Sequence, residues 1–374
     1  MMIRPDTEAE LAETIRSATA PFRIEGGGTR PVGEGGGGDV LSVAGLSGLT
    51  LYEPGALTVV VRAGTPLAEV EAALAEQGQQ LAFEPMDHRG LLGRDGVPTI
   101  GGMVAANISG PRRIAVGACR DFLLGVRFVD GQGRIVKNGG RVMKNVTGYD
   151  LVKLICGSFG TLGVLSEVSL KVLPRPRASG MLICEGLEDV GAVRALSRAL
   201  GAPYDVTGAA HVATGATLIR LEGFAESVRY RAGRLQRELA EFGDFAVEMD
   251  ADAVARVWAD LRDVAQFHGR DGDVWRVSVK PSDAPAIVAG LPDAEAIYDW
   301  GGGLIWLLVP DGQSGRAIRA LVARCGGHAT RVRGSGDIPA FQPQSAAVAA
   351  LQDGVRHRFD PRGLFNPGLM GAVA

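Results

Sequence analysis

The sequence predicts an α+β fold made of two domains and a C-terminal segment, on three observations. The chain has 374 residues and an apolar content of 46%, enough for two cores of ordinary size. Short apolar runs alternate with glycine-rich turns as far as residue 172, whereas longer helical patterns follow. The two regions meet at LPRPR, where two prolines interrupt regular structure. We therefore expect a first domain at 1–175, a second at 178–345 and a terminal segment at 346–374.

The first region is expected to open with a helix and to continue mainly as strands. Thr7 and Glu10 have the spacing of a capping box, which predicts that a helix begins there. A second short helix is predicted between Thr65, as its N-cap, and Gly78, at its C-terminal end. Four runs rich in Val, Ile, Leu and Phe predict strands: FRIEG, LTVVVRAG, LGVRFVDGQGRIVKNGG and LGVLSEVSLKVL. The D-G-Q-G within the third run predicts a hairpin.

The second region combines strand-length pieces with longer helices. The spacing of its apolar residues predicts helices at 227–243 and 251–269, and GGLIWLLVP is typical of a buried strand. The terminal segment contains SAAVAALQDGVRHRF and then DPRGLFNPG, which predict a helix followed by a loop rich in Pro and Gly.

Composition argues against several classes of function. A net charge of −3 without a dense run of Lys or Arg gives no sign of a nucleic-acid partner. The N-terminus lacks a signal-peptide core and no stretch is apolar enough to span a bilayer, so we expect a cytoplasmic protein that meets a membrane only through partner chains. The four cysteines form no C-x-x-C pair, so neither an iron–sulfur cluster nor another metal site is expected on this chain.

The glycine-rich stretch EGGGTRPVGEGGGG, residues 25–38, has two interpretations, a slack linker or an anion-binding nest. Gly26–Thr29 directly follow a predicted strand, and consecutive glycines can turn successive N–H groups toward one point. Arg30 would add a positive charge there. The second half also matches G-x-G-x-x-G, but strand-like DVLSV follows it instead of the helix that a dinucleotide motif requires, so we interpret that half as plain loop.

Two further glycine segments favour the nest over the linker. PTIGGMVAANISGPRR, residues 98–113, leaves little side-chain volume and lets backbone approach a flat or extended ligand. Tight packing between two backbones is the alternative for this segment. CGSFGTLGVLSEV, residues 156–168, again places glycines and hydroxyls before a strand. Three such loops within one region indicate a single extended ligand that carries phosphate.

Several segments together resemble a known FAD-binding superfamily. Four segments of this chain, in their order and spacing, resemble the FAD-binding domain of the vanillyl-alcohol oxidase (PCMH) type. They are GGGT, TIGGMVAANISG, GACRDFLLGVRFVDGQGRIV and KNVTGYDLVKLICGSFGTLGVLSEVSLKVLP. RFDPRGLFNPG resembles the closing motif of that superfamily. Within this superfamily, the chain resembles the FAD-binding E subunits of glycolate oxidase (glycolate dehydrogenase). The segments that carry this resemblance are RVMKNVTGYDL, GPRR…GACRD and YDWGGGLIWL. The resemblance implies that 178–345 form a smaller α+β cap and that the tail packs back on the FAD domain.

The resemblance also implies a set of cofactor-binding residues. The first loop would wrap the pyrophosphate, the second would line the pyrophosphate, ribityl chain and flavin ring, the third would add backbone contacts, and the tail would approach the ring. The set is Gly26, Gly27, Gly28, Thr29, Thr99, Ile100, Gly101, Gly102, Ala105, Ala106, Asn107, Gly110, Gly117, Gly160, Gly163, Val164 and Asn366. Because the first loop holds no His or Cys, and the nearest histidine, His88, is far downstream, we expect FAD to be bound non-covalently.

The implied reaction is oxidation of glycolate, a 2-hydroxy acid, to glyoxylate, with electrons passing to a partner iron–sulfur subunit beside a sister flavin subunit. This reaction needs cations for the carboxylate and a base for the hydroxyl proton. Related dehydrogenases use an H-x-H pair, often with a metal, and the five histidines here form no such pair. His328 and Tyr149 are the candidates that remain for substrate or flavin contact, each with a packing role as its alternative. Asp299 and Trp300 in YDWGGG shape either a strand or an interface.

Three functions stay open from the sequence. The chain is an FAD-dependent subunit that oxidises glycolate, or a non-catalytic FAD-binding, assembly or electron-relay subunit whose sister flavin subunit oxidises the substrate, or a separate flavin oxidase of another alcohol.

Overall fold

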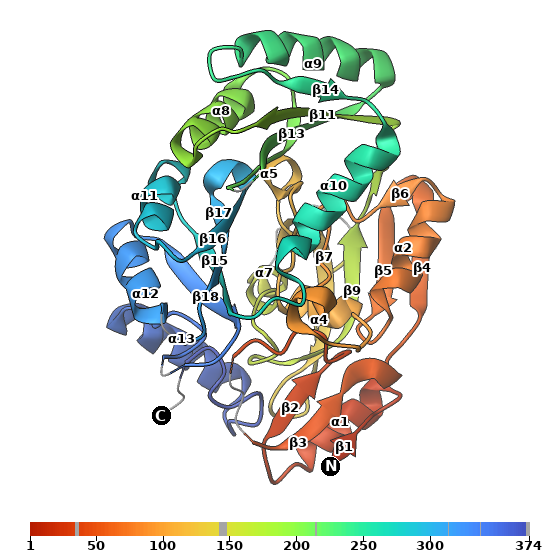
Figure 1. Ribbon diagram of the computed structural model, residues 1–374. Coiled ribbons are helices and arrows are strands. Elements are labelled where there is room, and N and C mark those ends of the chain that lie inside the picture. Colours follow the sequence, from red (N-terminus) through yellow and green to blue (C-terminus); the bar gives the residue numbers. More distant parts are fainter. Residues whose placement is uncertain (34–36, 142–147, 214, 313, 337, 372–374) are drawn as a thin grey trace.

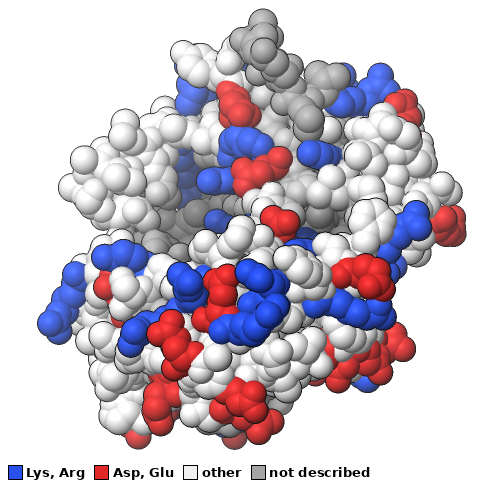
Figure 2. All heavy atoms as spheres, turned by 90° about the horizontal axis from the view of Figure 1, so that it is seen from above, with Lys and Arg blue, Asp and Glu red and all other residues white. Residues whose placement is uncertain are grey.

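The structure is a computed structural model of the chain and describes residues 1–33, 37–141, 148–213, 215–312, 314–336 and 338–371. Parts of RVMKNVTGYDL and of the loop containing Gly35 lie outside the described residues. The sheets form two groups along the sequence, one at the right and bottom of Figure 1 and one at its upper left. On the face shown in Figure 2, acidic and basic side chains are interspersed around a hollow. No described helix is long and apolar enough to cross a membrane.

The N-terminal part contains a parallel sheet, an antiparallel sheet and a short ribbon. The parallel sheet has the order β1-β3-β2, and the antiparallel sheet has the order β4-β5-β9-β7-β8. Its strands are β1 Met2–Ile3, β2 Phe22–Glu25, β3 Asp39–Ser42, β4 Leu49–Glu53, β5 Thr58–Arg62, β6 Gln79–Gln80, β7 Leu123–Val129, β8 Ile135–Gly139, β9 Val164–Lys171 and β10 Leu173–Pro174. Its helices are α1 Glu8–Arg16, α2 Leu67–Glu76, α3 Arg89–Leu92, α4 Ile100–Ala105, α5 Arg113–Val116, α6 Cys119–Phe122 and α7 Leu151–Ile155.

Local sequence signals were mostly sufficient to predict the helices and strands of this part. Thr7 is the N-cap of α1 and its Oγ1 accepts from the Glu10 N–H at 3.2 Å, and β7 and β8 form the hairpin predicted from D-G-Q-G. The prediction that Thr65 caps α2 is wrong, because Pro66 occupies the N-cap position. The Thr65 hydroxyl instead donates to the Arg62 carbonyl at 2.7 Å, so its side chain tightens the turn after β5.

The C-terminal part is built on one antiparallel sheet of order β14-β11-β13-β12-β16-β17-β15-β18. Its strands are β11 Ala178–Glu185, β12 Val206–Val212, β13 Ala216–Gly223, β14 Ala246–Glu248, β15 Asp273–Ser278, β16 Glu295–Asp299, β17 Leu304–Val309 and β18 His328–Arg333. The helices are α8 Asp189–Gly201, α9 Ala225–Glu238, α10 Ala251–Asp263, α11 Ala284–Ala289, α12 Gly315–Arg324 and α13 Ala346–Phe359.

The two faces of this large sheet have different neighbours. Alternate strand residues such as Leu182 and Trp275 pack in cores with α8, α9, α11 and α12. The residues between them, such as Met181 and Val274, share a core with α10 and with Met86 and Leu91 of the N-terminal part. Because successive strand residues point to opposite faces, Arg276 on β15 belongs to the second face. That face is the one turned toward the N-terminal part.

The predicted helices of the second region exist, but both end earlier than expected. The helix expected at 227–243 is α9, and the one expected at 251–269 is α10. Helix α10 stops early because Val264 adopts a left-handed conformation (φ +55°), after which only a 3₁₀ turn, Ala265–Phe267, continues. GGLIWLLVP forms β17, whose six residues are all buried, as the sequence predicted.

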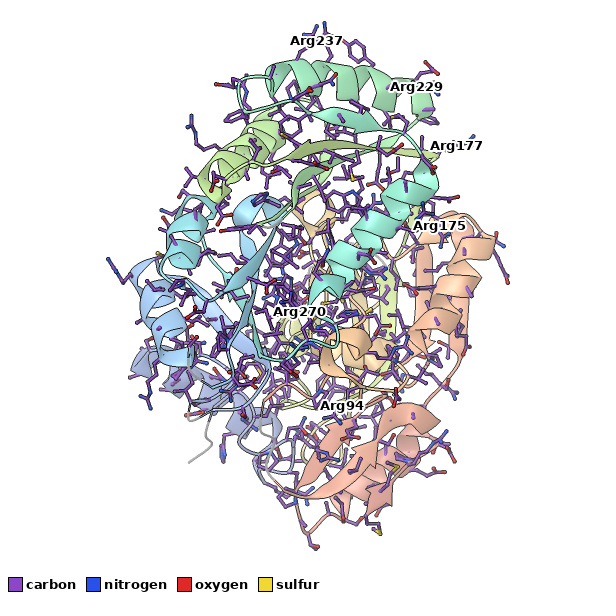
Figure 3. The ribbon with its side chains drawn as sticks, in the orientation of Figure 1. Arg94, Arg175, Arg177, Arg229, Arg237 and Arg270 are labelled. Carbon is purple, nitrogen blue, oxygen red and sulfur yellow. The ribbon has the colours of Figure 1, made fainter. Side chains whose placement is uncertain are left out.

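The change from one sheet to the other occurs between β10 and β11. Figure 3 shows Arg175 and Arg177 at this junction, on the right-hand edge of the molecule. Arg175 still pairs with the N-terminal part, because its Nε donates to the Gln79 carbonyl at 3.2 Å. Division of the chain into domains at 175 and 178 stays a prediction, since independent folding of the two parts has not been tested.

The tail returns to the N-terminal part, as predicted. The Phe22 N–H donates to the Leu364 carbonyl at 2.7 Å, and the Asn366 N–H donates back to the Phe22 carbonyl at 3.0 Å. Phe365 is fully buried in the core of the N-terminal part. The last residues of the chain therefore extend the edge of β2, immediately before the first glycine loop.

Candidate functional site

The first glycine loop follows β2 and has unpaired amide donors. Gly28 takes a left-handed conformation (φ +67°). Among the described residues, no hydrogen bond uses the backbone N–H of Gly27, Gly28, Thr29 or Arg30. Successive free amides in a loop that contains a left-handed residue are typical of an anion-binding nest. The loop therefore suits a ligand that carries phosphate.

Close contact with the second glycine segment requires glycine in the first loop. A Cβ at Gly27 would lie 1.5 Å from the Val97 carbonyl oxygen, and one at Gly26 would lie 2.1 Å from Thr99 Oγ1. Thr99 is the N-cap of α4 and accepts from the Gly102 N–H at 3.3 Å. The two segments thus pack backbone against backbone, and both line the same cavity. Tight packing between two backbones, one of the two alternatives for this segment, is therefore present, and the binding of a ligand there stays a prediction.

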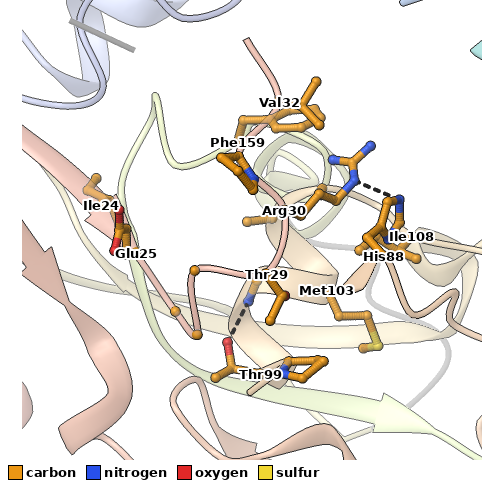
Figure 4. Close-up of a pocket in the computed structure, with 18 of the residues that line it drawn as sticks. Ile24, Glu25, Thr29, Arg30, Val32, His88, Thr99, Met103, Ile108 and Phe159 are labelled. Carbon is orange, nitrogen blue, oxygen red and sulfur yellow. Dashed lines mark hydrogen bonds between the residues drawn. The ribbon is translucent and has the colours of Figure 1, made fainter. Parts of the chain in front are cut away.

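The first cavity, which we call the glycine cavity, has a volume of about 210 Å³ (Figure 4). Its lining includes Gly26, Gly27, Gly28, Thr29, Thr99, Gly102, Ala105, Ala106 and Asn366 from the predicted set. A smaller adjoining cavity of about 70 Å³ is lined by Gly101, Gly160 and Gly163, together with Gly26, Gly102 and Ala105. The three glycine segments therefore converge on one region, as the sequence predicted.

Asn366 ties the tail to two of these segments. Its Oδ1 accepts from the Ile24 N–H at 2.8 Å, and its Nδ2 donates to the Phe159 carbonyl at 2.8 Å. The residue is 5% exposed and lines the glycine cavity. Its side chain is fully used in holding β2 and the third loop together, so its direct contact with a flavin ring stays a prediction.

Five predicted site residues lie away from the lining of the glycine cavity and of its smaller neighbour. Ile100 and Val164 are fully buried core residues, and Gly117 lies beside Asp121. The Gly110 carbonyl accepts from Trp300 Nε1 at 3.1 Å. Asn107 instead lines a second cavity, which adjoins the glycine cavity. Tyr149 is 88% exposed and lines none of these cavities, so the structure does not bring it to the other candidates.

A second cavity, which we call the basic cavity, has a volume of about 250 Å³. It lies against the inner face of the large sheet and contains Arg113, Arg276 and His328. The residues that it shares with the glycine cavity are Arg30, Met86, His88, Ala106, Ile108 and Phe159. None of the described residues in its lining is Asp or Glu. The glycine cavity thus continues into a region of uncompensated positive charge.

Arg30 and His88 stand where the two cavities join. Arg30 Nε donates to His88 Nε2 at 3.0 Å, and the Arg30 guanidinium lies over the Phe159 ring, 5.2 Å from its centroid (Figure 4). Burial and Arg30 hold the pKa of His88 well below its usual range, so the ring is neutral. Burial, reinforced by Arg276, lowers the pKa of Arg30 to about 9. Arg30 Nη1 is buried and has no hydrogen-bond partner among the described residues.

Arg113 and Arg276 both contact the ring of Trp300. Arg113 of α5 lies 4.4 Å from the ring centroid, and Arg276 of β15 lies 5.2 Å from it. Neither guanidinium forms a hydrogen bond or an ion pair with a described residue. Burial, together with the neighbouring Arg113, lowers the pKa of Arg276 to about 10. Burial also lowers the pKa of Arg113, and Arg120 adds to the shift.

Asp299 and His328 are the titratable groups next to these arginines. Burial raises the pKa of Asp299 to about 7, although its Oδ1 accepts from the Trp300 N–H at 2.6 Å. His328 is partly buried, and burial followed by Arg276 and Arg319 lowers its pKa below the usual value. The structure therefore brings His328 to the basic cavity, while YDWGGG supplies the tryptophan that holds two arginines.

Sequence reasoning missed three members of this site. His88 was discounted because it lies far from the glycine loop in sequence, yet it contacts Arg30 directly. Arg276 had a usable signal, a charged residue in the middle of the apolar strand VWRVS. Arg113 belongs to GPRR, which was noted only for its resemblance. These residues come from separate segments, and only the packing of the large sheet on the N-terminal part brings them together.

Comparisons with known proteins agree on family and cofactor. A family model described as FAD binding domain matches residues 1–139. Glycolate oxidase subunit GlcE of Escherichia coli (strain K12) is 38% identical over 100% of this chain and 99% of that protein. D-2-hydroxyglutarate dehydrogenase of Xanthomonas citri pv. viticola is 28% identical over 83% of this chain and 75% of its own.

A solved structure shares the fold at low sequence identity. Alkyldihydroxyacetonephosphate synthase aligns with a TM-score of 0.71 and 16% identity, covering 98% of this chain and 76% of its own. Together with the family model, this shared fold confirms the predicted α+β fold with a PCMH-type FAD-binding domain. FAD is the cofactor, and the run of free amides in the first loop fits its pyrophosphate. The chain is an FAD-linked oxidoreductase that belongs to the glycolate oxidase subunit GlcE family.

Proposed function

We propose that this chain is the FAD-binding subunit of a glycolate oxidase complex and that it oxidises glycolate to glyoxylate. One observation carries the proposal: the glycine cavity, which suits a pyrophosphate, is continuous with a cavity that suits a carboxylate. Six residues line both cavities, so a cofactor held in the first would reach toward a substrate held in the second. The name of the E. coli relative supplies the substrate.

The reaction divides between cofactor and protein. Bound FAD supplies the two-electron acceptor for the hydride that leaves the α-carbon of the hydroxy acid. The chain must neutralise the substrate carboxylate, accept the hydroxyl proton and keep water out. Arginines without carboxylate partners suit the first task, and a neutral histidine suits the second. Trp306 and Phe159 form apolar parts of the same lining.

We further propose that FAD is held without a covalent bond. The only described histidine in the glycine cavity is His88, and both of its ring nitrogens are engaged. One accepts from Arg30 and the other forms a hydrogen bond with the Met86 backbone. Acid precipitation of the purified protein should therefore release all of the flavin into the supernatant. Flavin that stays with the pellet would contradict non-covalent binding.

The partners proposed for this subunit are a sister FAD-binding subunit and an iron–sulfur subunit that takes the electrons. Similarity to a second subunit supports a division of labour, since glycolate oxidase subunit GlcD of Bacillus subtilis (strain 168) is 32% identical over 42% of this chain and 31% of that protein. The same observation favours an alternative, in which this chain binds FAD for assembly or electron relay and the sister subunit oxidises glycolate. We propose a cytoplasmic location, with any attachment at the membrane made through these partners.

The deciding experiment uses the purified chain alone, loaded with FAD and kept anaerobic. Bleaching of the visible flavin absorbance on adding glycolate supports oxidation on this chain. Bleaching only after the partner subunits are added supports the relay alternative and contradicts the first proposal. A protein that cannot be loaded with FAD would contradict both.

A paired substitution tests the nest itself. Gly27→Asp should reduce flavin content by more than about tenfold, because the new side chain collides with the Val97 carbonyl and brings negative charge to the free amides. Gly55→Ala is the matched control, since a Cβ there meets no atom within 4 Å. Equal flavin content in the two variants would contradict the placement of the pyrophosphate.

A further inference from the structure

We propose that Arg113 and Arg276, on the ring of Trp300, bind the carboxylate of a small 2-hydroxy acid, with His328 as the base for its hydroxyl proton. The inference rests on the proposed function and deepens it, because it locates the substrate site on this chain and not on the sister subunit. The ligand class is a short carboxylate whose neighbouring carbon carries a hydroxyl or an oxo group.

The first argument concerns charge. Buried or partly buried cations are normally paired, because removal from water is costly unless an anion or hydrogen bonds compensate it. Arg113 and Arg276 have no such partner among the described residues, and the described lining of their cavity has no acid. Asp121 acts on Arg113 and Asp299 on Arg276 only through space, and the Asp299 Oδ1 accepts from the Trp300 N–H. An exogenous anion is the missing partner.

The second argument concerns geometry. Trp300 is fixed at both ends, by the bond from its Nε1 to the Gly110 carbonyl and by the bond from its N–H to Asp299. Two guanidinium groups that contact such a ring are oriented by it while their N–H groups stay free. A fixed guanidinium with free N–H groups binds a carboxylate through two parallel hydrogen bonds. The arrangement favours a planar carboxylate over a spherical anion.

The third argument separates this site from the cofactor. Arg113 and Arg276 line the basic cavity but not the glycine cavity, whereas Arg30 lines both. The free amides of the first loop and Arg30 therefore stand on the pyrophosphate side. The two remaining arginines are available for a second anion, and Arg276 and His328 share its cavity.

The fourth argument selects the base. His88 is already occupied by Arg30 and Met86, so it cannot accept a further proton without losing a hydrogen bond. His328 forms no hydrogen bond through its ring with any described residue, and burial, followed by Arg276 and Arg319, lowers its pKa below the usual value, which favours the neutral ring. The proton from the substrate hydroxyl would go to this ring as the hydride leaves the α-carbon. His88 and His328 are the histidines in the described lining of the basic cavity, and only the ring of His328 is without a hydrogen bond.

The test measures binding to the FAD-loaded full chain, with oxalate as a short carboxylate that cannot be oxidised. Calorimetric titration should give saturable binding in the wild type, and Arg276→Gln and Arg113→Gln should each weaken it by about tenfold to a hundredfold. Arg229→Gln is the control, because Arg229 projects from α9 and pairs only with Glu226 (Figure 3). Its affinity should equal that of the wild type.

Three outcomes would overturn the assignment. They are no oxalate binding by the wild type, equal affinity in all three variants, or equally tight binding of sulfate, which would reduce the site to a general anion trap. Flavin content and thermal unfolding must match the wild type in each variant, and Arg276→Lys provides a folded alternative that should recover part of the affinity. Arginine-dependent oxalate binding without flavin bleaching by glycolate would leave the site standing and contradict the proposed oxidation.

His328 has its own readout. His328→Asn should lower the rate of flavin reduction by glycolate at least tenfold and leave the oxalate affinity within about twofold. In the wild type the rate should fall only at a pH below 6.5, since the pKa of His328 is lowered from that value, and the variant should lose this acid limb. An unchanged acid limb in the variant would show that another group accepts the proton.

Discussion

Two groups of arginines meet at the contact between the N-terminal part and the large sheet, one buried and one half-buried, and they differ in how their charge is balanced. In the first group, which we call the paired network, Arg112 and Arg220 lie with Glu84 and Glu222. Arg220 Nη1 and Nη2 reach the two Glu84 oxygens, each at 2.9 Å, and Arg112 pairs with Glu222. In the second group, neither Arg113 nor Arg276 forms an ion pair with a described acid, and Asp121 and Asp299 act on them only through space.

The difference shows which arginines serve the fold. Burial alone would raise the pKa of Glu84, but Arg220 and Arg112 bring it below its usual value, so this carboxylate is ionised and the two acids balance the two arginines without a ligand. Burial and Arg113 lower the pKa of Arg276 to about 10, and Asp299 offsets this only in part, without a hydrogen bond or an ion pair to the guanidinium. A charge that the fold leaves unbalanced indicates a ligand, whereas a balanced one indicates a structural link between the two parts.

The largest expected effect comes from breaking the paired network. Glu84→Gln would leave Arg220 and Arg112 with one acid between them, which should lower the free energy of unfolding by about 3–5 kcal/mol. Chemical denaturation at pH 7 measures this. Glu295→Gln is the control, because Glu295 forms an exposed pair with Arg270 and its loss should cost less than about 1 kcal/mol. Equal losses in both variants would mean that the network carries no special stability.

A second effect depends on pH and comes from Asp299, which faces Glu84, Arg220 and Arg276. Its pKa of about 7 lies above the unfolded value of about 3.9, so the native state holds a proton that the unfolded state has lost. Stability should therefore fall as the pH rises from about 4 to about 7. Asp299→Asn cannot ionise, so relative to the wild type it should gain roughly 2–4 kcal/mol over that window. Parallel pH profiles of unfolding for the two proteins would refute the shift.

The same contrast explains what the sequence could predict. The glycine segments were found because their chemistry is local: consecutive small residues next to a strand already define a nest. Ile100 and Val164 were predicted from the same segments; helix α4 and strand β9 turn these two side chains into the core, where both are fully buried, so only their backbone is left for the predicted contact with the cofactor. Within a segment, the direction of a side chain depends on the element that forms, and motif matching does not resolve it.

The basic cavity could not be predicted from the sequence, for a different reason. Arg113, Arg276 and Trp300 come from α5, β15 and the turn after β16, and their contacts depend on the packing of the large sheet. His328 was chosen because it is a histidine near arginines, yet the arginine it meets is Arg276, and not Arg331 or Arg333 beside it in the sequence. Long-range packing decides which cations stay unpaired, and a single sequence carries little information on that.

The smallest expected effect is the most direct test of the comparison. Arg276→Gln removes a charge that forms no ion pair with a described acid, so the free energy of unfolding without ligand should stay within about 1 kcal/mol of the wild type or increase slightly. Arg220→Gln, from the paired network, should instead lose about 3–5 kcal/mol, because Glu84 and Glu222 would be left with Arg112 alone. Oxalate at a hundred times its dissociation constant should then stabilise the wild type by about 2.7 kcal/mol and Arg276→Gln by far less. If Arg276→Gln proved as destabilising as Arg220→Gln, Arg276 would be a structural residue, and the distinction between the two groups would fail.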